Sequence, residues 1–299
     1  MPTFGTTEHD ITCLFPIGHE FDYDHHHYTI LKSGKPKPPR GECKTDTYVL
    51  AVDESGSHRE FKISIKQPNA EFLENKIKLE RAKEIFGDDA QTIINKALEA
   101  IKCNFEEDKL VCVKPYKRSA AKTIKLGWKF ELLKKDGGKK AGRIELSEEQ
   151  KWNIYAGTNL SKDKRDCKVN NEVIPESGVA NMFLVAQPGD NSLDKVLPKL
   201  IKMEDFIRSV PSTVYFACKA LNYRLEDGKW DGDRPLAVYV QWDKIDGKLD
   251  GKLVMDRPLE VKGNEVGEHI KNLVAGYGIN KDNFEEIEHC LSDNTPIYK

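Results

Sequence analysis

Two short runs near the N-terminus are rich in β-branched and apolar residues, which is the pattern of β-strands. The runs are Thr47 to Val52 and His58 to Lys66, and the cluster Asp53 to Ser57 between them is rich in turn-forming residues. Together they predict an antiparallel hairpin. Because side chains alternate between the faces of a strand, Ile63 and Ile65 are expected on a buried face and the polar residues of the same run on the other.

The position of the turn predicts which residues of the two strands lie opposite each other. If the turn centres on residues 55–56, Asp46 at the start of the first strand lies opposite roughly residues 64–66. Glu60 then lies opposite the stretch around Leu50. An aspartate and a lysine are therefore expected to meet at the far end of the hairpin.

This arrangement resembles the PD-(D/E)XK nuclease fold, in which an aspartate opens one strand and an acid-x-lysine triplet ends the next. Glu60-Phe61-Lys62 has the literal spelling, whereas Ser64-Ile65-Lys66 matches a known variant in which serine replaces the acid. Distance favours the second triplet, because Glu60 lies roughly 13 Å further along the strand from Asp46 than Ser64 does. The resemblance therefore implies that Asp46, Ser64 and Lys66 are catalytic.

The serine variant needs a second carboxylate, because Mg²⁺ is held by oxygen ligands that commonly include one or two carboxylates. Glu42, just before Asp46, is one candidate. The resemblance implies a glutamate from the next helix instead, and Glu80 has about the right spacing. That helix is predicted from about Ala70 to Phe86, with Asn69 as its N-cap. Both candidates stay open.

The resemblance implies hydrolysis of a phosphodiester with Mg²⁺ as cofactor. The expected metal ligands are Asp46, the carbonyl of Ile65, and Glu42 or Glu80, and Glu42 also joins the expected catalytic residues. Lys66 is expected to position or deprotonate the attacking water and to stabilise charge on the phosphate.

A strongly basic segment follows the predicted helix. Residues 109–143 contain twelve Lys and Arg against Glu131 and Asp136, although the whole chain has a formal net charge of −2. Such charge, mixed with aromatic residues, is suited to DNA phosphates. The turn at residues 134–140 predicts a basic β-hairpin here. With a second basic stretch at residues 32–40, the expected DNA contacts are Lys35, Lys37, Arg40, Lys117, Arg118, Lys122, Lys125, Lys134, Lys135, Lys139 and Lys140.

The rest of the chain mixes strand and helix patterns, which is typical of an α/β protein. The predicted elements are strands at residues 110–113, 123–133, 182–186, 213–221 and 236–242, helices near residues 193–207 and 266–277, and a hairpin at residues 246–252. The resemblance implies a restriction-endonuclease-like mixed central β-sheet flanked by helices, with a basic β-rich insertion.

We expect one catalytic domain spanning residues 1–299. It would comprise the nuclease hairpin and helix at 40–105, a DNA-contact insertion at about 109–175, and the remaining sheet and helices at 176–299.

Other features of the sequence point to a cytoplasmic protein without a membrane partner. No apolar run approaches the ~18 residues of a transmembrane helix, and the N-terminus lacks the features of a secretory signal. Seven scattered cysteines without a C-x-x-C pair indicate reduced thiols rather than disulfides or structural zinc.

The sequence thus predicts a Mg²⁺-dependent endonuclease acting on double-stranded DNA. The resemblance further implies a site-specific type II restriction enzyme that works as a homodimer. Two alternatives stay open: a nuclease of the same fold acting on RNA or on branched or damaged DNA, and a non-catalytic nucleic-acid-binding protein whose hairpin only resembles a catalytic one.

Overall fold

The computed structural model describes residues 4–68, 72–75 and 77–299 and folds them as a mixed α/β protein. The chain forms two compact units: unit 1 comprises Met1–Ala70 and Leu146–Ser212, and unit 2 comprises Glu71–Glu145 and Thr213–Lys299. This division differs from the expected single domain with an insertion at 109–175. Local sequence patterns do not reveal the division, because strands after residue 212 pair with a strand between residues 71 and 145, and residues 146–212 of unit 1 lie between them in the sequence.

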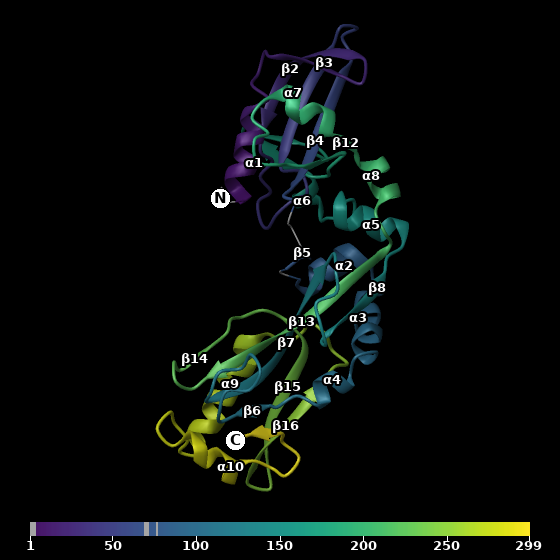
Figure 1. Cartoon of the computed structure of the whole chain (residues 1–299). Helices are drawn as coiled ribbons and strands as arrows, with labels where there is room; N and C mark the ends of the chain where they lie inside the picture. Colours follow the sequence, from purple (N-terminus) through teal and green to yellow (C-terminus); the bar gives the residue numbers. More distant parts are fainter. Residues whose placement is uncertain (1–3, 69–71, 76) are drawn as a thin grey trace. The chain divides into compact units, whose positions relative to one another are not determined.

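Unit 1 is built on a six-stranded mixed sheet in the order β1-β2-β3-β4-β11-β12. Its strands are β1 (Glu20–Tyr23), β2 (His26–Gly34), β3 (Thr47–Asp53), β4 (His58–Lys66), β11 (Met182–Val185) and β12 (Ile201–Lys202) (Figure 1). Neighbouring strands are antiparallel except β4 and β11, which are parallel. The predicted hairpin is thus continued by the strand predicted near residue 182.

Helices cover both faces of this sheet. The described elements outside it are α1 (Phe4–Cys13), α5 (Glu148–Tyr155), α6 (Lys162–Arg165), α7 (Leu193–Val196), η1 (Leu197–Lys199) and α8 (Met203–Ser209), with the small hairpin of β9 (Cys167–Val169) and β10 (Glu172–Ile174). Ile11 of α1 and Val196 of α7 pack with Ile63 of β4 in one cluster. Phe183 of β11 joins a second cluster and stacks on Phe206 of α8, with ring centroids 3.7 Å apart. Unit 1 therefore has three layers: helix, sheet and helix.

The predicted register of the hairpin is confirmed. Thr47 pairs with Ile63, and Leu50 pairs with Glu60. The turn is stabilised by the Asp53 carboxylate, which accepts hydrogen bonds from two backbone N–H groups of the following residues. The apolar side chains of β4 are buried as expected, so the far end of the hairpin lies where the sequence places it.

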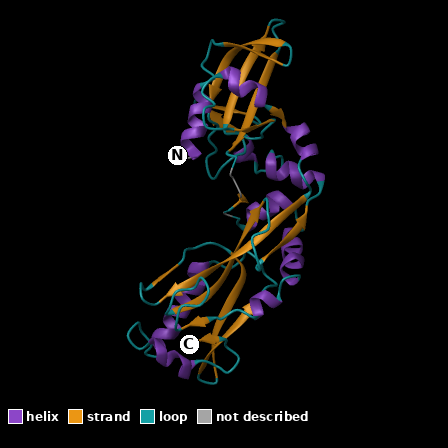
Figure 2. Cartoon of the chain, viewed as in Figure 1, coloured by secondary structure: helices purple, strands orange, loops and turns teal. Residues whose placement is uncertain are grey.

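Unit 2 contains a nine-stranded sheet with the main order β14-β13-β7-β15-β16. Its strands, drawn in orange in Figure 2, are β5 (Phe72–Glu74), β6 (Val111–Cys112), β7 (Thr123–Leu133), β8 (Ala141–Glu145), β13 (Thr213–Arg224), β14 (Lys229–Trp230), β15 (Leu236–Ile245), β16 (Lys248–Val254) and β17 (Ile297–Tyr298). The described helices are α2 (Leu79–Phe86), α3 (Ala90–Glu99), α4 (Cys103–Glu106), α9 (Gly263–Gly276), η2 (Phe284–Glu286) and α10 (Ile287–Cys290).

The centre of unit 2 is β7, whose side chains are buried on both faces. Phe105 packs edge-on against Trp128 with ring centroids 5.1 Å apart, and Phe130 stacks on Phe216 at 5.2 Å. Gly127 lies where β15 approaches most closely: a Cβ atom there would lie 2.3 Å from the carbonyl oxygen of Val238. Only glycine permits this approach.

Two helix predictions are wrong in part. Phe72–Glu74 forms β5 on the edge of β7 rather than the start of a helix, and α2 begins only at Leu79. Asn69, the predicted N-cap, lies outside the described residues. The predicted helix near 193–207 is interrupted after Val196, because Pro198 lies in a 3₁₀ turn that leads into β12.

The predicted basic hairpin around residues 134–140 is also wrong. The strands on either side of this turn, β7 and β8, do not pair with each other, because β13 lies between them and pairs with both. The later hairpin at residues 246–252 is confirmed as β15 and β16.

Within the described ranges, no helix has the length and apolar character needed to cross a bilayer.

Candidate active site

Asp46 lies at the open end of the hairpin, where its side chain is fixed against β4. Its backbone N–H donates to the carbonyl of Ile63 at 2.8 Å. Its Oδ2 accepts a hydrogen bond from the backbone N–H of Ile65 at 2.7 Å. The carboxylate therefore extends the hydrogen-bonding of the strand pair beside Ser64 and Lys66.

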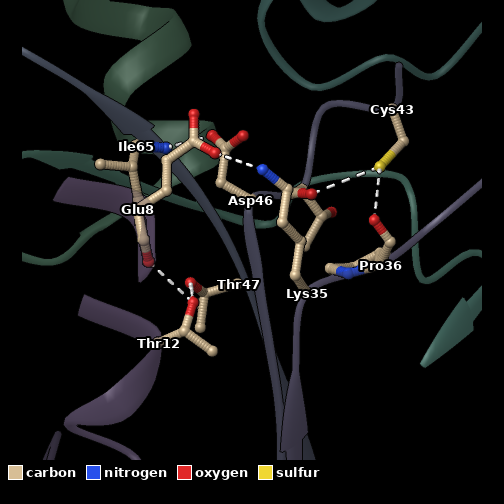
Figure 3. Close-up of polar contacts among 9 residues, drawn as sticks. Glu8, Thr12, Lys35, Pro36, Cys43, Asp46, Thr47 and Ile65 are labelled. Atoms are coloured by element: carbon tan, nitrogen blue, oxygen red, sulfur yellow. Dashed lines mark hydrogen bonds and ion pairs between the residues drawn. The ribbon is translucent and has the colours of Figure 1, made fainter. Parts of the chain in front are cut away.

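A second carboxylate, that of Glu8, reaches this end of the sheet from α1. Thr12 donates its hydroxyl to the Glu8 carbonyl at 2.8 Å, and the hydroxyls of Thr12 and Thr47 lie 2.6 Å apart. This contact joins α1 to the first residue of β3, directly after Asp46. Figure 3 shows Glu8, Asp46 and Lys35 pointing toward one another, with Lys35 paired to the Glu8 carboxylate.

Burial and neighbouring charges shift the pKa of one acid and one lysine at this site. Burial raises the pKa of Asp46 to about 6, the positive charge of Lys66 opposes that shift, and the negative charge of Glu8 adds to it. For Lys35, burial opposes ionisation, but the hydrogen bond and charge of Glu8 outweigh it and raise the pKa. The charges of Glu8, Lys35 and Lys66 thus all act on Asp46.

The structure brings Asp46, Ser64, Ile65 and Lys66 together as the register predicts. Lys66 is half-buried and its charge acts on Asp46. Ser64 is only 1% exposed, so its hydroxyl belongs to the interior of the sheet rather than to an open surface. Glu60, from the competing triplet, instead accepts a hydrogen bond from the Tyr48 hydroxyl at 2.6 Å.

The two glutamates expected from the sequence occupy other places. Glu42 is exposed in the loop that precedes Asp46, and Glu80 is exposed in the first turn of α2, within unit 2. The carboxylate whose charge raises the pKa of Asp46 is that of Glu8. The sequence does contain a signal for it: Glu8 precedes Ile11 and Phe15 at helical spacing, which places an acid on a buried helix face.

The donor set fits Mg²⁺ in kind, although it is small. Among the residues that the structure describes, no three His, Cys, Asp or Glu side chains gather closely enough to hold a metal ion. Asp46 and Glu8 supply two carboxylates, and Mg²⁺ commonly takes one or two, with waters and substrate phosphate completing its shell. The Ile65 carbonyl stays a predicted ligand.

A pocket of about 510 Å³ adjoins the site within unit 1. It is lined by residues of α1, by Gln67 and Pro68 after β4, and by residues 186–191 after β11. Thr7 and Gln67, which neighbour Glu8 and Lys66 in the chain, are hydrogen-bonded at 3.2 Å on its wall. The pocket therefore lies at the carboxyl ends of two parallel strands, where open sheets commonly bind ligands.

The expected DNA-contact residues fall into two groups. Lys125 is only 3% exposed, and its ammonium donates to the Ser119 hydroxyl at 3.2 Å, so its side chain does not face solvent. The prediction for this residue is wrong, because both faces of β7 are covered. Lys122 and Lys140 are half-buried and paired with Glu226 at 3.1 Å and Asp108 at 2.9 Å.

The other predicted contacts are exposed. They are Lys35, Lys37 and Arg40 in unit 1 and Lys117, Arg118, Lys134, Lys135 and Lys139 in unit 2. Lys35 is engaged by Glu8, and Lys117 lies 3.8 Å from Asp108. The exposed residues keep the capacity for phosphate contact that the sequence predicts.

No protein-family model, no curated protein and no solved structure matches this chain.

Proposed function

We propose that this protein is a Mg²⁺-dependent nuclease of the PD-(D/E)XK type, with its active site at the open end of the β3–β4 hairpin in unit 1. The observation that carries the proposal is the gathering of Asp46, Glu8 and Lys66 around the Ile65 backbone. An acid whose pKa is raised, as that of Asp46 is, beside a lysine is a common feature of catalytic sites.

The architecture of unit 1 supports the same proposal. A mixed sheet with helices on both faces is what the restriction-endonuclease-like fold requires, and the aspartate opens one strand while the serine-x-lysine triplet ends the next. Glu8 supplies the second carboxylate that the serine variant needs, in place of Glu42 or Glu80.

The residues of the site have distinct roles in hydrolysis. Asp46 and Glu8 would hold the cation through their carboxylate oxygens, and the Ile65 N–H fixes the orientation of Asp46. When bound, Mg²⁺ polarises the phosphate and lowers the pKa of water. Lys66 positions or deprotonates the attacking water and stabilises the developing charge on the phosphate. Lys35, drawn away from Glu8 by a phosphate, adds a second positive charge.

The proposed substrate is double-stranded DNA. Its phosphates would contact Lys37 and Arg40 beside the site and the exposed basic residues of unit 2. A type II restriction role, a cytoplasmic location and a homodimer that cuts both strands belong to the same proposal.

The direct test is digestion of a long duplex DNA by the purified protein with Mg²⁺ or EDTA. Discrete Mg²⁺-dependent fragments are expected, and a smear would retain the nuclease but remove site specificity. Single-stranded RNA and branched DNA in parallel reactions would identify the alternative substrates, and binding without cleavage of any of them would overturn the enzymatic role.

Glu8 has a matched control in the same chain. Glu8→Gln is expected to lower cleavage by roughly 10²-fold or more, because it removes a ligand charge without changing shape. Glu42→Gln and Glu80→Gln change exposed carboxylates and are expected to cleave like the original protein. Loss of activity in Glu42→Gln with normal activity in Glu8→Gln would reverse the assignment.

A further inference from the structure

Two cysteines from distant segments of unit 1 lie close together beside Gly178. Cys43, in the loop before Asp46, is partly exposed, and Cys167, at the start of β9, is fully buried. The two side chains are close enough for each thiol to shift the pKa of the other, and the Cys167 sulfur also lies 3.1 Å from the Lys164 carbonyl oxygen. The Cys43 sulfur also lies 3.3 Å from the Thr45 carbonyl and 3.9 Å from the Pro36 carbonyl, as Figure 3 shows for Pro36. Residues far apart in the sequence thus form a dithiol.

Backbone hydrogen bonds hold the two segments together on both sides of this contact. Lys37 and Lys168 exchange a pair of N–H to carbonyl bonds of 2.9 and 3.1 Å. Lys44 and Thr45 both donate to the carbonyl of Gly178, at 2.9 and 3.3 Å. The thiols are therefore fixed near each other by the fold itself, without a disulfide.

Gly178 keeps the space between the thiols clear. A Cβ atom at this position would lie 2.0 Å from the Lys164 carbonyl oxygen, 2.9 Å from the Cys167 sulfur and 3.0 Å from the Cys43 Cβ. Any larger residue would force the two cysteines or their backbone apart. The close approach of the sulfurs therefore depends on glycine.

The two thiols differ in exposure and in the direction in which their surroundings shift the pKa. The hydrogen bond from Cys167 lowers the pKa of Cys43, and burial opposes that shift. The hydrogen bond with Cys43 and burial both raise the pKa of Cys167. A partly exposed thiol with a lowered pKa beside a buried partner with a raised pKa is the arrangement of a reactive cysteine with its resolving cysteine.

We propose that Cys43 and Cys167 are an oxidisable dithiol that hydrogen peroxide converts reversibly into a disulfide. The Cys43 thiolate attacks peroxide, the O–O bond breaks, and Cys43 becomes a sulfenic acid as hydroxide leaves. The Cys167 sulfur then attacks the Cys43 sulfur, the S–O bond breaks, and the oxygen leaves as water with the Cys167 proton. Two electrons pass from the thiols to the peroxide, and an added dithiol reductant returns them.

Oxidation would alter contacts on both sides of the candidate active site. The Cys43 sulfur must leave the Pro36 and Thr45 carbonyls to bond with Cys167. These carbonyls belong to the residues next to Lys35 and Asp46. The inference concerns the thiols alone and does not rest on nuclease activity.

The test is mass spectrometry of the full native chain. Reduced protein is exposed to a few equivalents of peroxide, blocked with an alkylating agent and digested. A peptide pair linked through Cys43 and Cys167 is expected, and dithiothreitol should remove it. Cys43 should react roughly ten-fold faster than the exposed Cys103, because thiolate is the reactive form. Oxidation of both at equal rates would overturn the proposal.

Variants separate the two steps. Cys167→Ser should stop at a sulfenic acid on Cys43 that dimedone traps, and Cys43→Ser should leave Cys167 unoxidised. Cys13→Ser, which changes an exposed cysteine, should form the linked pair like the original protein. Because either core variant can fail to fold, the original protein unfolded in urea serves as a second control. Linkage there at the native rate would show that the fold does not create the dithiol.

Discussion

Each unit of this protein contains an aspartate beside lysines, half-buried in unit 1 and buried in unit 2, but the two aspartates differ in charge balance. In unit 1, burial raises the pKa of Asp46 to about 6 despite Lys66. In unit 2, burial opposes ionisation of Asp108, but the hydrogen bond of Lys140 and the charge of Lys125 outweigh it and lower the pKa. Lys140 lies 2.9 Å from Asp108, whereas in unit 1 Lys35 is paired with Glu8 rather than with Asp46.

The comparison separates a structural charge cluster from a candidate catalytic one. Asp108 is only 8% exposed, and the protein itself supplies its counter-charges, so nothing further is needed to keep it ionised. Asp46 shares its region with a second acid, and its ionised form is poorly compensated. A bound cation would supply the positive charge that the ionised Asp46 carboxylate lacks in the unliganded protein. We therefore expect opposite responses from the two aspartates to the same substitution.

The largest expected difference is in cleavage. Asp46→Asn should lower Mg²⁺-dependent cleavage of duplex DNA by roughly 10³-fold, because it removes a ligand charge at the scissile phosphate. Asp108→Asn, assayed well below its melting temperature, should cleave within about two-fold of the original protein, as expected for a site outside the chemistry. Gel assays of both variants, with circular dichroism to verify folding, provide the measurement. Equal losses of cleavage in the two variants would show that Asp46 is no more important for catalysis than Asp108.

The next largest effect is on the stability of unit 2. Asp108→Asn leaves Lys125 and Lys140 without their counter-charge in a buried setting, and we expect a loss of about 2–4 kcal/mol of unfolding free energy at pH 7. The pKa of Asp108 is lowered in the folded chain. The carboxylate therefore adds to the unfolding free energy above 3.8, its pKa in the unfolded chain, and this contribution is lost as the pH falls below that value. Urea unfolding at pH 7 and pH 3.5 tests this, and a loss independent of pH would indicate packing rather than charge.

Asp46→Asn should have the opposite sign. In the folded chain the pKa of Asp46 is about 6, whereas the ordinary pKa of an aspartate is 3.8. Stability from the Asp46 proton is fully present below pH 3.8 and is lost as the pH rises through 6. At pH 8, a neutral Asn that still accepts the Ile65 hydrogen bond should therefore stabilise the fold by about 1–3 kcal/mol, with allowance for partial exposure. Urea titrations at pH 5 and pH 8 measure it, and a destabilised variant at pH 8 would contradict the charge argument.

These contrasts also show where the sequence is informative. The Asp46–Lys66 end of the hairpin was predictable, because alternation and turn chemistry are local and together determine the register. Helical spacing indicates that Glu8 lies on a buried helix face, but its place beside Asp46 was not predictable, because it depends on a long-range contact between Thr12 of α1 and Thr47 of β3. A strand pattern likewise cannot tell that Lys125 lies inside unit 2, since β7 is covered on both faces only after distant strands and helices pack around it.

The division into units has the same origin. The register of β13 against β7 and β8 joins segments that are separated by part of unit 1 in the sequence. Nothing local to β7 or β8 predicts a partner strand between them, so the sequence pattern favoured a hairpin instead. Strand pairs that are close in the sequence were predicted. Strand pairs of unit 2 that are separated in the sequence by residues of unit 1 were not.

The smallest expected effect is the stabilisation of the fold by Mg²⁺ without substrate. At a concentration ten times its dissociation constant, a ligand that binds only the folded chain adds about 1.4 kcal/mol, which corresponds to a few degrees in Tm. We expect this increase at pH 8, where Asp46 is ionised, and its decline toward zero at pH 5, where the proton occupies the carboxylate. Asp46→Asn should abolish the increase and Asp108→Asn should keep it. A thermal shift that survives in Asp46→Asn would place the cation elsewhere in the chain, and the raised pKa of Asp46 would then report burial alone.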